Sequence, residues 1–282
     1  MILFKKTDRF QAYLQNARSK RNSIGFVPTM GALHSGHISL VTASKKDNQV
    51  TAASIFVNPA QFNDKKDFEK YPITIEKDIE WLITAGCDAL FLPSAEEVYP
   101  NGYSQPSQYD LGYLETILEG KYRPGHFQGV CKVMNRLLDI VQPDNLYMGQ
   151  KDYQQCMVVK RLITIMQSAT ILHTCPTLRE ADGLAMSSRN TRLSPEERKK
   201  AVAISATLNN IKNDIKPGEL SAVIDDSIAR LADLQFTVDY VAIADAETLE
   251  LLTQWNGKEK IVALIAAFQN EVRLIDNMLL NN

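Results

Sequence analysis

Short hydrophobic runs alternate with longer segments of mixed polarity over the first 175 residues of the chain. The short runs are rich in β-branched and aromatic residues, which favours β-strands. We expect five strands, at residues 23–28, 50–57, 88–92, 145–148 and 170–174. In the longer segments hydrophobic residues recur every three or four positions, as in amphipathic helices. These segments are residues 36–46, 74–85, 127–140 and 152–166.

Strands that alternate with helices in this way predict a mainly parallel sheet with helices on both faces. The fold class expected is therefore α/β, with a Rossmann-like, doubly wound parallel sheet. Ligands of such sheets bind outside the carboxyl ends of the strands. We therefore expect the chemistry of this chain in the loops that follow its strands.

The pattern changes after about residue 185. Ser194 and Pro195 suit the cap and first position of a helix, and residues 216–234 predict a second helix, entered through Pro217 and Gly218. Three hydrophobic runs, at residues 236–247, 260–268 and 272–277, then predict an antiparallel sheet. We expect a first domain over residues 1–176 and a smaller α+β C-terminal domain over residues 177–282.

Composition and charge narrow the class of protein. The 31 basic and 33 acidic residues nearly balance, which argues against a broad nucleic-acid surface. Four widely spaced cysteines without a CxxC pair indicate buried thiols of a reducing compartment. Neither a signal peptide nor a membrane-spanning run is evident. We expect a soluble cytoplasmic protein without nucleic-acid or membrane partners.

The first candidate motif follows the strand at residues 23–28. The chain lacks GxGxxG and GxxxxGK[ST], so any nucleotide must be bound by another device. His34-Ser35-Gly36-His37 is such a device, because glycine admits a phosphate close to the backbone and a helix start offers free N–H groups. The alternative is a strand-to-helix turn that happens to contain two histidines.

Two further motifs follow predicted strands. Asn58 and Gln61 in IFVNPAQF carry amides that suit hydroxyl and carboxylate groups, or they serve a turn begun by Asn-Pro. In GQKDYQQ, Lys151 is a movable cation for phosphate, whereas Asp152 and Gln155 have the spacing of a helix capping box.

Near the expected domain boundary, MSSRN offers two hydroxyls and a guanidinium, a set suited to polyphosphate. Alone it also fits a polar linker. Because phosphate-suited groups recur at HxGH, GQKD and MSSRN, the three motifs together favour an adenylate-forming site.

With these motifs the sequence resembles the pantoate–β-alanine ligase family of the HxGH nucleotidyltransferase superfamily. The resemblance covers nearly the whole chain. It rests on PTMGALHSGH, SIFVNPAQF, LEGKYRPGHFQGV, QPDNLYMGQKDYQQ and PTLREADGLAMSSRN, which occur in that order.

The resemblance implies that ATP and (R)-pantoate form pantoyl-adenylate and pyrophosphate, after which β-alanine gives pantothenate and AMP. ATP is then a substrate that arrives with Mg²⁺ held mainly by its phosphates, and no organic prosthetic group is implied. A homodimer through the N-terminal domain and a C-terminal lid are also implied.

The resemblance also assigns residues. It implies His37 as proton donor, with His34 and Lys151 as its catalytic partners. The ATP-binding residues implied are Met30, Gly31, Ala32, Leu33, His34, Ser35, Gly36, His37, Gly149, Gln150, Lys151, Asp152, Leu178, Met186, Ser187, Ser188 and Arg189. Those implied for pantoate and β-alanine are Gln61, Gln155, Asn58, Arg123 and Tyr71.

Three positions depart from the family pattern. Gln150 replaces the usual glutamate of GEKD, Ile73 stands where an arginine often follows Tyr-Pro, and Cys131-Lys132 replaces a more usual Thr-Val. Gln150 keeps the size of the side chain but removes a charge, so the role of that carboxylate beside Lys151 or magnesium is open.

Elementary chemistry leaves one step open as well. A pantoate carboxylate is ionised at neutral pH, because carboxyl pKa values lie near ~4, and it needs no general base. The β-alanine amine must lose a proton, for which neutral His37, water and phosphate are alternatives. Rival interpretations are an adenylyltransferase that acts on a phosphorylated acceptor, and a nucleotide-binding regulator or tRNA-binding fragment without catalytic activity.

Overall fold

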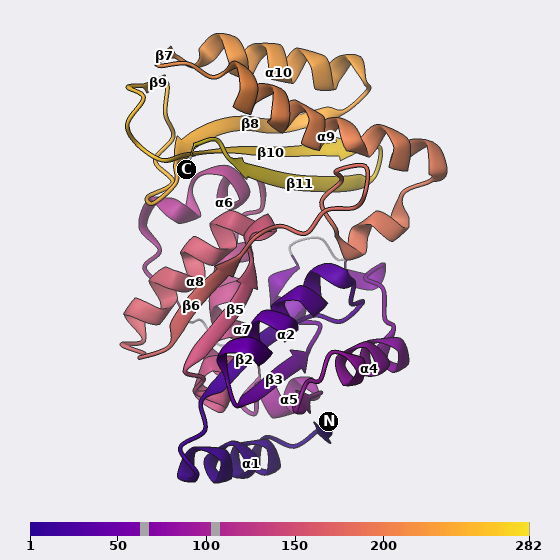
Figure 1. Ribbon diagram of the computed structural model, residues 1–282, viewed down its shortest axis with the longest axis vertical. Helices are drawn as coiled ribbons and strands as arrows, with labels where there is room; N and C mark the ends of the chain where they lie inside the picture. Colours follow the sequence, from indigo (N-terminus) through magenta and orange to yellow (C-terminus); the bar gives the residue numbers. More distant parts are fainter. Residues whose placement is uncertain (63–67, 103–107, 282) are drawn as a thin grey trace. The chain divides into compact units, whose positions relative to one another are not determined.

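The chain divides into two units in the computed structural model, which describes residues 1–62, 68–102 and 108–281 (Figure 1). The N-terminal unit comprises Met1–Gly149 and Gln155–Pro176. The C-terminal unit comprises Gln150–Gln154 and Thr177–Asn282. The five residues Gln150–Gln154 thus group with the C-terminal unit, although residues of the N-terminal unit flank them in the sequence.

A six-stranded parallel sheet forms the centre of the N-terminal unit, in the order β1-β4-β3-β2-β5-β6. This confirms the predicted fold class, and all five predicted strands are present. The sequence pattern missed the short edge strand β1. The strands are β1 (Ile2–Phe4), β2 (Ile24–Thr29), β3 (Val50–Ile55), β4 (Ala89–Phe91), β5 (Asn145–Gly149) and β6 (Ile171–Cys175).

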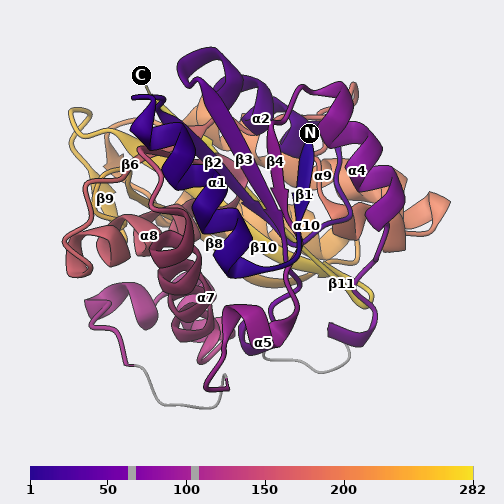
Figure 2. The same ribbon diagram turned by 90° about the horizontal axis from the view of Figure 1, so that it is seen from below.

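Helices cover both faces of this sheet (Figure 2). On one face, α2 (Ser35–Asp47) and α4 (Ile75–Thr84) pack over a hydrophobic cluster that includes Val27, Leu40 and Leu82. On the other face lie α1 (Thr7–Ser19) and α7 (His126–Val141). Further helical segments are η1 (Pro59–Gln61), α5 (Ala95–Val98), η2 (Gly112–Glu115), α6 (Leu118–Tyr122) and α8 (Tyr153–Ile165).

Helix α1 was not predicted, although its signal is visible in the sequence. Phe10, Leu14 and Ala17 have helical spacing and are buried. The ring of Phe10 stacks on that of Phe91 in β4, with 4.8 Å between centroids. Only these three buried positions mark the helical spacing of hydrophobic residues, and the polar residues between them made the pattern hard to recognise in the sequence.

The strand order reverses beside β2. From β2 the chain proceeds through β3 and β4 on one side, and it returns to β5 and β6 on the other. Such a reversal is where open parallel sheets bind their ligands. The loops after β2 and β3 begin at this edge and lead to HxGH and NPAQF, and β5 ends there at Gly149.

An antiparallel sheet, in the order β11-β10-β8, forms the core of the C-terminal unit together with α9 and α10, which pack on it (Figure 1). The three strands are β8 (Thr237–Asp245), β10 (Ile261–Gln269) and β11 (Val272–Leu279). Helix α9 (Pro195–Asp214) begins with the predicted Ser194 cap, which forms a reciprocal capping box with Glu197. The 3-10 segments η3 (Gln150–Asp152) and η4 (Ser188–Arg192) also belong to this unit.

The predicted helix over residues 216–234 begins later than expected. Helix α10 spans Ser221–Asp233, and Gly218–Glu219 form a short strand β7 that pairs with β9 (Gln254–Trp255). Gly218 has φ +131°, a backbone conformation that is not helical and that suits glycine. The sequence pattern therefore merged a strand with the helix that follows it.

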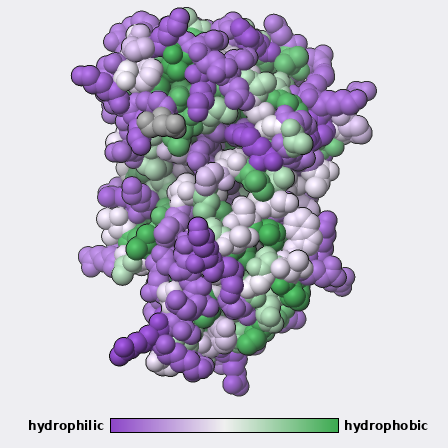
Figure 3. All heavy atoms as spheres, in the orientation of Figure 1, coloured by the Kyte–Doolittle hydropathy of each residue, from purple (hydrophilic) through white to green (hydrophobic). Residues whose placement is uncertain are grey.

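Hydrophilic residues cover much of the face shown in Figure 3, between smaller hydrophobic groups. Across the described ranges no helix combines the length and the hydrophobicity that a membrane crossing requires. Cys87, Cys131 and Cys156 are buried as expected, whereas Cys175 is only half-buried.

Candidate active site

The turn between β2 and α2 has an unusual backbone. Gly31 and Ala32 both have positive φ, +81° and +49°. For alanine this left-handed conformation costs about 1 kcal/mol or more, so other contacts must maintain it. The turn brings His34 to the N-cap of α2.

Asp78 in the first turn of α4 supplies those contacts. Its carboxylate accepts hydrogen bonds from the backbone N–H groups of Ala32 (2.9 Å) and Leu33 (2.8 Å). It also accepts one from the hydroxyl of Thr74 (3.0 Å), and Asp78 is 1% exposed. A buried carboxylate therefore holds the strained turn that precedes the HxGH motif.

The two histidines of HxGH cap helix α2 reciprocally. The N–H of Gly36 donates to Nδ1 of His34 (3.2 Å), and the N–H of His34 donates to Nδ1 of His37 (3.3 Å). A nitrogen that accepts carries no proton, so in the neutral rings the proton is on Nε2. The two ring centroids lie 4.1 Å apart.

The NPAQ segment is seated on α7. Asn58 is 1% exposed, and its amide donates to the carbonyl of Gly129 (3.2 Å) and accepts from the hydroxyl of Tyr99 (2.9 Å). A β-carbon at Gly129 would lie 1.9 Å from the carbonyl oxygen of Ala60. Gln61 is the last residue of the 3-10 turn η1, which is packed closely against α7 at this point.

A histidine outside the predicted site connects two residues inside it. Nδ1 of His126 lies 2.9 Å from the carbonyl of Gln61, and its Nε2 lies 3.1 Å from the guanidinium of Arg123. A carbonyl only accepts and a guanidinium only donates, so both contacts suit the tautomer that carries its proton on Nδ1. Arg123 also pairs with Glu119 (3.5 Å). Tyr71 is 9% exposed and packs edge-on against Phe62.

The GQKD segment begins where β5 ends. Gly149 is the last residue of β5, Gln150–Asp152 form the 3-10 turn η3, and Gln155 lies in α8, half-buried. Lys151 is half-buried, and within the described ranges no carboxylate pairs with its ammonium group. No carboxylate of the described ranges therefore neutralises this charge, which leaves the ammonium group suited to bind a phosphate.

Leu178 and Met186 lie on a small hairpin that the sequence did not predict. The N–H of Met186 donates to the carbonyl of Leu178 (3.0 Å), and Arg179 and Ala185 form an antiparallel β-bridge. Ser187 then caps η4 by accepting from the N–H of Arg189 (3.3 Å). The MSSRN segment, for which a polar linker was the alternative, is thus part of the C-terminal unit.

Sequence reasoning identified the motifs but not the residues that hold them. Asp78 has the sequence signature of an ordinary acidic residue in a first helical turn, and His126 is a single histidine just before a predicted helix. Neither has a local pattern that marks its partner, since Ala32 is 46 positions from Asp78 and Gln61 is 65 positions from His126.

The sheet is Rossmann-like, and a histidine-capped helix begins at the edge where its strand order reverses. These features define an α/β protein of the nucleotide-binding class. The chain belongs to the pantoate–β-alanine ligase family, whose model, described as Pantoate-beta-alanine ligase, matches residues 2–279. The predictions of family, fold class and enzyme class are confirmed.

The relatives match over nearly their whole length. Pantothenate synthetase of Cytophaga hutchinsonii is 43% identical over 284 residues, with 99% of both chains covered. The Moorella thermoacetica pantothenate synthetase is 44% identical over 274 residues, with 95% of this chain and 94% of the relative covered.

Solved structures show the same fold. The pantothenate synthetase of Thermus thermophilus superposes with a TM-score of 0.90 at 38% identity, with 100% of both chains covered. The pantoate-beta-alanine ligase from Francisella tularensis, complexed with Beta-gamma ATP and Beta-alanine, has a TM-score of 0.85 at 36% identity. That comparison covers 100% of this chain and 98% of the other.

Proposed function

We propose that this chain condenses (R)-pantoate with β-alanine at the expense of ATP, through a pantoyl adenylate, and releases pyrophosphate and AMP. The observation that carries the proposal is the histidine-capped turn, in which Nδ1 of His34 and Nδ1 of His37 each accept a backbone N–H at the start of α2. The ligase that is complexed with Beta-gamma ATP and Beta-alanine, and that covers the whole chain, supports ATP and β-alanine as substrates.

In the first step, a carboxylate oxygen of pantoate bonds to the α-phosphorus of ATP, and the bond from that phosphorus to pyrophosphate breaks. Negative charge grows on the departing pyrophosphate. The donors of His34 and His37 and the cation of Lys151 are suited to stabilise that charge, which is the interaction that accelerates such transfers. We assign the catalytic role to these three residues.

In the second step, the amine of β-alanine bonds to the acyl carbon of the adenylate, and AMP departs with one oxygen that came from pantoate. The amine must lose a proton. His37 is poorly suited to accept it, because Nε2 already carries a proton and Nδ1 is engaged in the helix cap. We therefore propose that a phosphate oxygen or water accepts the proton.

Further residues are proposed to bind the substrates without taking part in the chemistry. Gln61, Gln155, Arg123 and Tyr71 are proposed to bind pantoate and β-alanine. For Asn58 we propose positioning of Gln61, because its amide is buried and bonded to Gly129 and Tyr99. The residues proposed to bind ATP beside the catalytic three are Met30, Gly31, Ala32, Leu33, Ser35, Gly36, Gly149, Gln150, Asp152, Leu178, Met186, Ser187, Ser188 and Arg189.

Magnesium is proposed to enter with ATP as part of the substrate. Within the described ranges no three His, Cys, Asp or Glu side chains are grouped as a metal site would need, so the proposal leaves most magnesium ligands to the phosphates and water. A cytoplasmic homodimer without nucleic-acid or membrane partners is also proposed, and light scattering of the purified protein tests the dimer.

Isotope exchange between pyrophosphate and ATP tests this function against its rivals. We expect exchange that requires pantoate and proceeds without β-alanine, since the first step is reversible and complete in itself. Exchange that needs a phosphorylated acceptor in place of pantoate would indicate an adenylyltransferase. The absence of any exchange under all substrate combinations would indicate a nucleotide-binding protein without this activity.

A further inference from the structure

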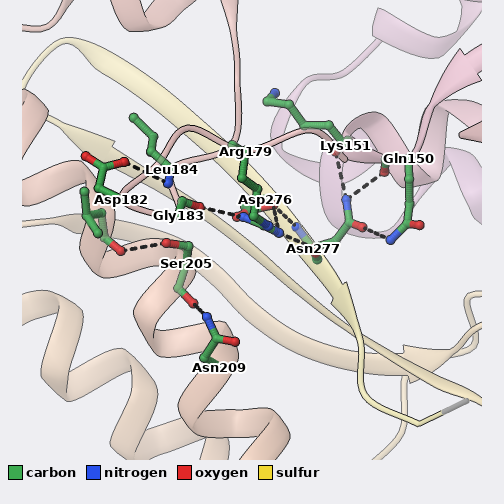
Figure 4. Close-up of polar contacts among 12 residues, drawn as sticks. Gln150, Lys151, Arg179, Asp182, Gly183, Leu184, Ser205, Asn209, Asp276 and Asn277 are labelled. Atoms are coloured by element: carbon green, nitrogen blue, oxygen red, sulfur yellow. Dashed lines mark hydrogen bonds and ion pairs between the residues drawn. The ribbon is translucent and has the colours of Figure 1, made fainter. Parts of the chain in front are cut away.

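Asn277, near the end of the last strand β11, is bonded to the turn that carries Lys151 (Figure 4). Its side-chain Nδ2 donates to the carbonyl of Gln150 (2.9 Å) and to the carbonyl of Lys151 (2.8 Å). Its Oδ1 accepts from the side-chain amide of Gln150 (3.2 Å). Asn277 is 2% exposed, so these three bonds are made almost without competition from water.

The hydrogen bonds fix the orientation of the Asn277 amide. A flipped amide would set its oxygen against two carbonyl oxygens and its NH₂ group against the NH₂ group of Gln150, and none of these pairs is a hydrogen bond. Only a donor at the Nδ2 position holds both carbonyls. Asparagine is therefore matched to the backbone of the turn and to the glutamine at position 150.

The backbone of Asn277 is fixed as well. Asp276 accepts two bonds from the guanidinium of Arg179 (2.6 and 3.1 Å) and one from the N–H of Asn277 (2.8 Å). Arg179 also donates to the carbonyls of Asn277 (3.3 Å) and Gly183 (3.1 Å). The Lys151 turn is thereby joined, through β11, to the hairpin that carries Leu178 and Met186.

We propose that Asn277 is a positioning residue for Lys151, and that the last strand of the C-terminal unit in this way sets the geometry of phosphate binding. The inference rests on the proposed role of Lys151. The Lys151 side chain extends away from Asn277 (Figure 4), so Asn277 acts on the backbone of the turn without contact to the phosphate.

The same geometry explains the departure at position 150. Gln150 donates to Oδ1 of Asn277, whereas a glutamate carboxylate in that orientation would oppose an oxygen with an oxygen. Gln150 therefore takes part in the hydrogen bonds that hold the turn. Its replacement by alanine removes one of the three bonds and leaves the two from Nδ2.

The test compares Asn277→Ala and Asn277→Asp in the wild-type and Lys151→Ala backgrounds, with kcat/KM for ATP in the pantoate-dependent exchange reaction as the readout. We expect Asn277→Ala to lower kcat/KM on the order of 10- to 100-fold, the range for lost support of a catalytic group. Asn277→Asp should be at least as damaging, because it keeps the acceptor but turns both donors into an acceptor. In the Lys151→Ala background either change should cost less than about threefold.

A matched control is Asn281→Ala. Asn281 lies four positions beyond Asn277 and also bonds to backbone, accepting from the N–H of Ile261 and donating to the carbonyl of Glu259, both at 2.8 Å. We expect this variant to lose thermal stability with unchanged kcat/KM. If Asn277→Ala does not fold, Gln150→Ala takes its place, with an expected loss of a few-fold that also disappears in the Lys151→Ala background.

The outcomes distinguish the proposed role of Lys151 from the proposed positioning role of Asn277. Equal losses in both backgrounds would mean that Asn277 acts only on stability, and the inference would be overturned. Wild-type activity of Lys151→Ala would remove the role of Lys151 itself, and the inference with it. A loss that is large in the wild-type background and absent beside Lys151→Ala supports positioning.

Discussion

The substitution Asp78→Asn tests whether the HxGH turn must be held to work. One carboxylate oxygen of Asp78 accepts from Leu33 and Thr74, and the other accepts from Ala32. Asparagine retains one acceptor. If it serves Leu33 and Thr74, its NH₂ group faces the N–H of Ala32, and that buried donor loses its acceptor.

The magnitude follows from those contacts. A hydrogen bond to a charged group contributes about 1.5–3 kcal/mol, and a buried group without its partner costs about 1–3 kcal/mol. We expect a loss of about 2–4 kcal/mol in the free energy of unfolding, which for units of this size lowers the melting temperature by roughly 5–15 °C. Relaxation of the left-handed turn at Ala32 would displace His34, and a displacement of about 1 Å costs on the order of 10²-fold in rate.

The assay is pyrophosphate–ATP exchange with saturating pantoate, measured well below the melting temperature of the variant. Asp88→Asn is the control. Asp88 also accepts a backbone N–H, that of Thr51 (2.7 Å), and it pairs with Lys45. It lies, however, at the amino ends of the strands, whereas the HxGH turn lies at their carboxyl ends. We expect the control to lose stability while exchange is retained. Normal exchange by folded Asp78→Asn would refute the claim that this carboxylate positions the turn.

Three further predictions concern His37, Gln61 and the two most deeply buried thiols that have a raised pKa. His37→Asn should slow single-turnover formation of the adenylate by roughly 10²–10⁴-fold with little change in ATP affinity, and an unchanged rate in a rapid-quench experiment would reduce HSGH to a structural turn. Gln61→Ala should raise the KM for pantoate more than that for ATP, and steady-state kinetics showing the reverse would invert the assignment of the pocket. Burial raises the thiol pKa of Cys87 to about 11 and that of Cys131 to about 12. At pH 8 both thiols are therefore almost wholly protonated, and iodoacetamide should label them in the unfolded protein but not in the native one.

The sequence predicted the parallel sheet because its central strands are short runs dominated by hydrophobic and small residues, as in β3, which is buried throughout Val50–Ile55. It located the motifs because groups suited to phosphate recur after predicted strands, where parallel sheets bind their ligands. The start of α10 was misplaced because Pro217 and Gly218 suit a helix entry as well as they suit the short strand that is present.

The residues that hold the site were beyond sequence reasoning for a physical reason. Asn277 and Asp78 act through the backbone atoms of distant residues, and a backbone N–H or carbonyl has no side-chain identity to match. Any turn of the same shape would offer them the same partners. Only the folded arrangement of β11 with η3, and of α4 with the β2–α2 turn, reveals these roles.

The central claim, that a pantoate oxygen attacks the α-phosphorus of ATP, is tested most directly by isotope transfer. Pantoate labelled with ¹⁸O at both carboxylate oxygens is converted with unlabelled ATP and β-alanine, and the masses of the separated products are measured by mass spectrometry. We predict one ¹⁸O in each AMP and none in pyrophosphate, because the amine displaces AMP together with the oxygen that pantoate supplied. Unlabelled AMP, or label in an inorganic phosphate product, would contradict the adenylate route and the roles assigned to His34, His37 and Lys151.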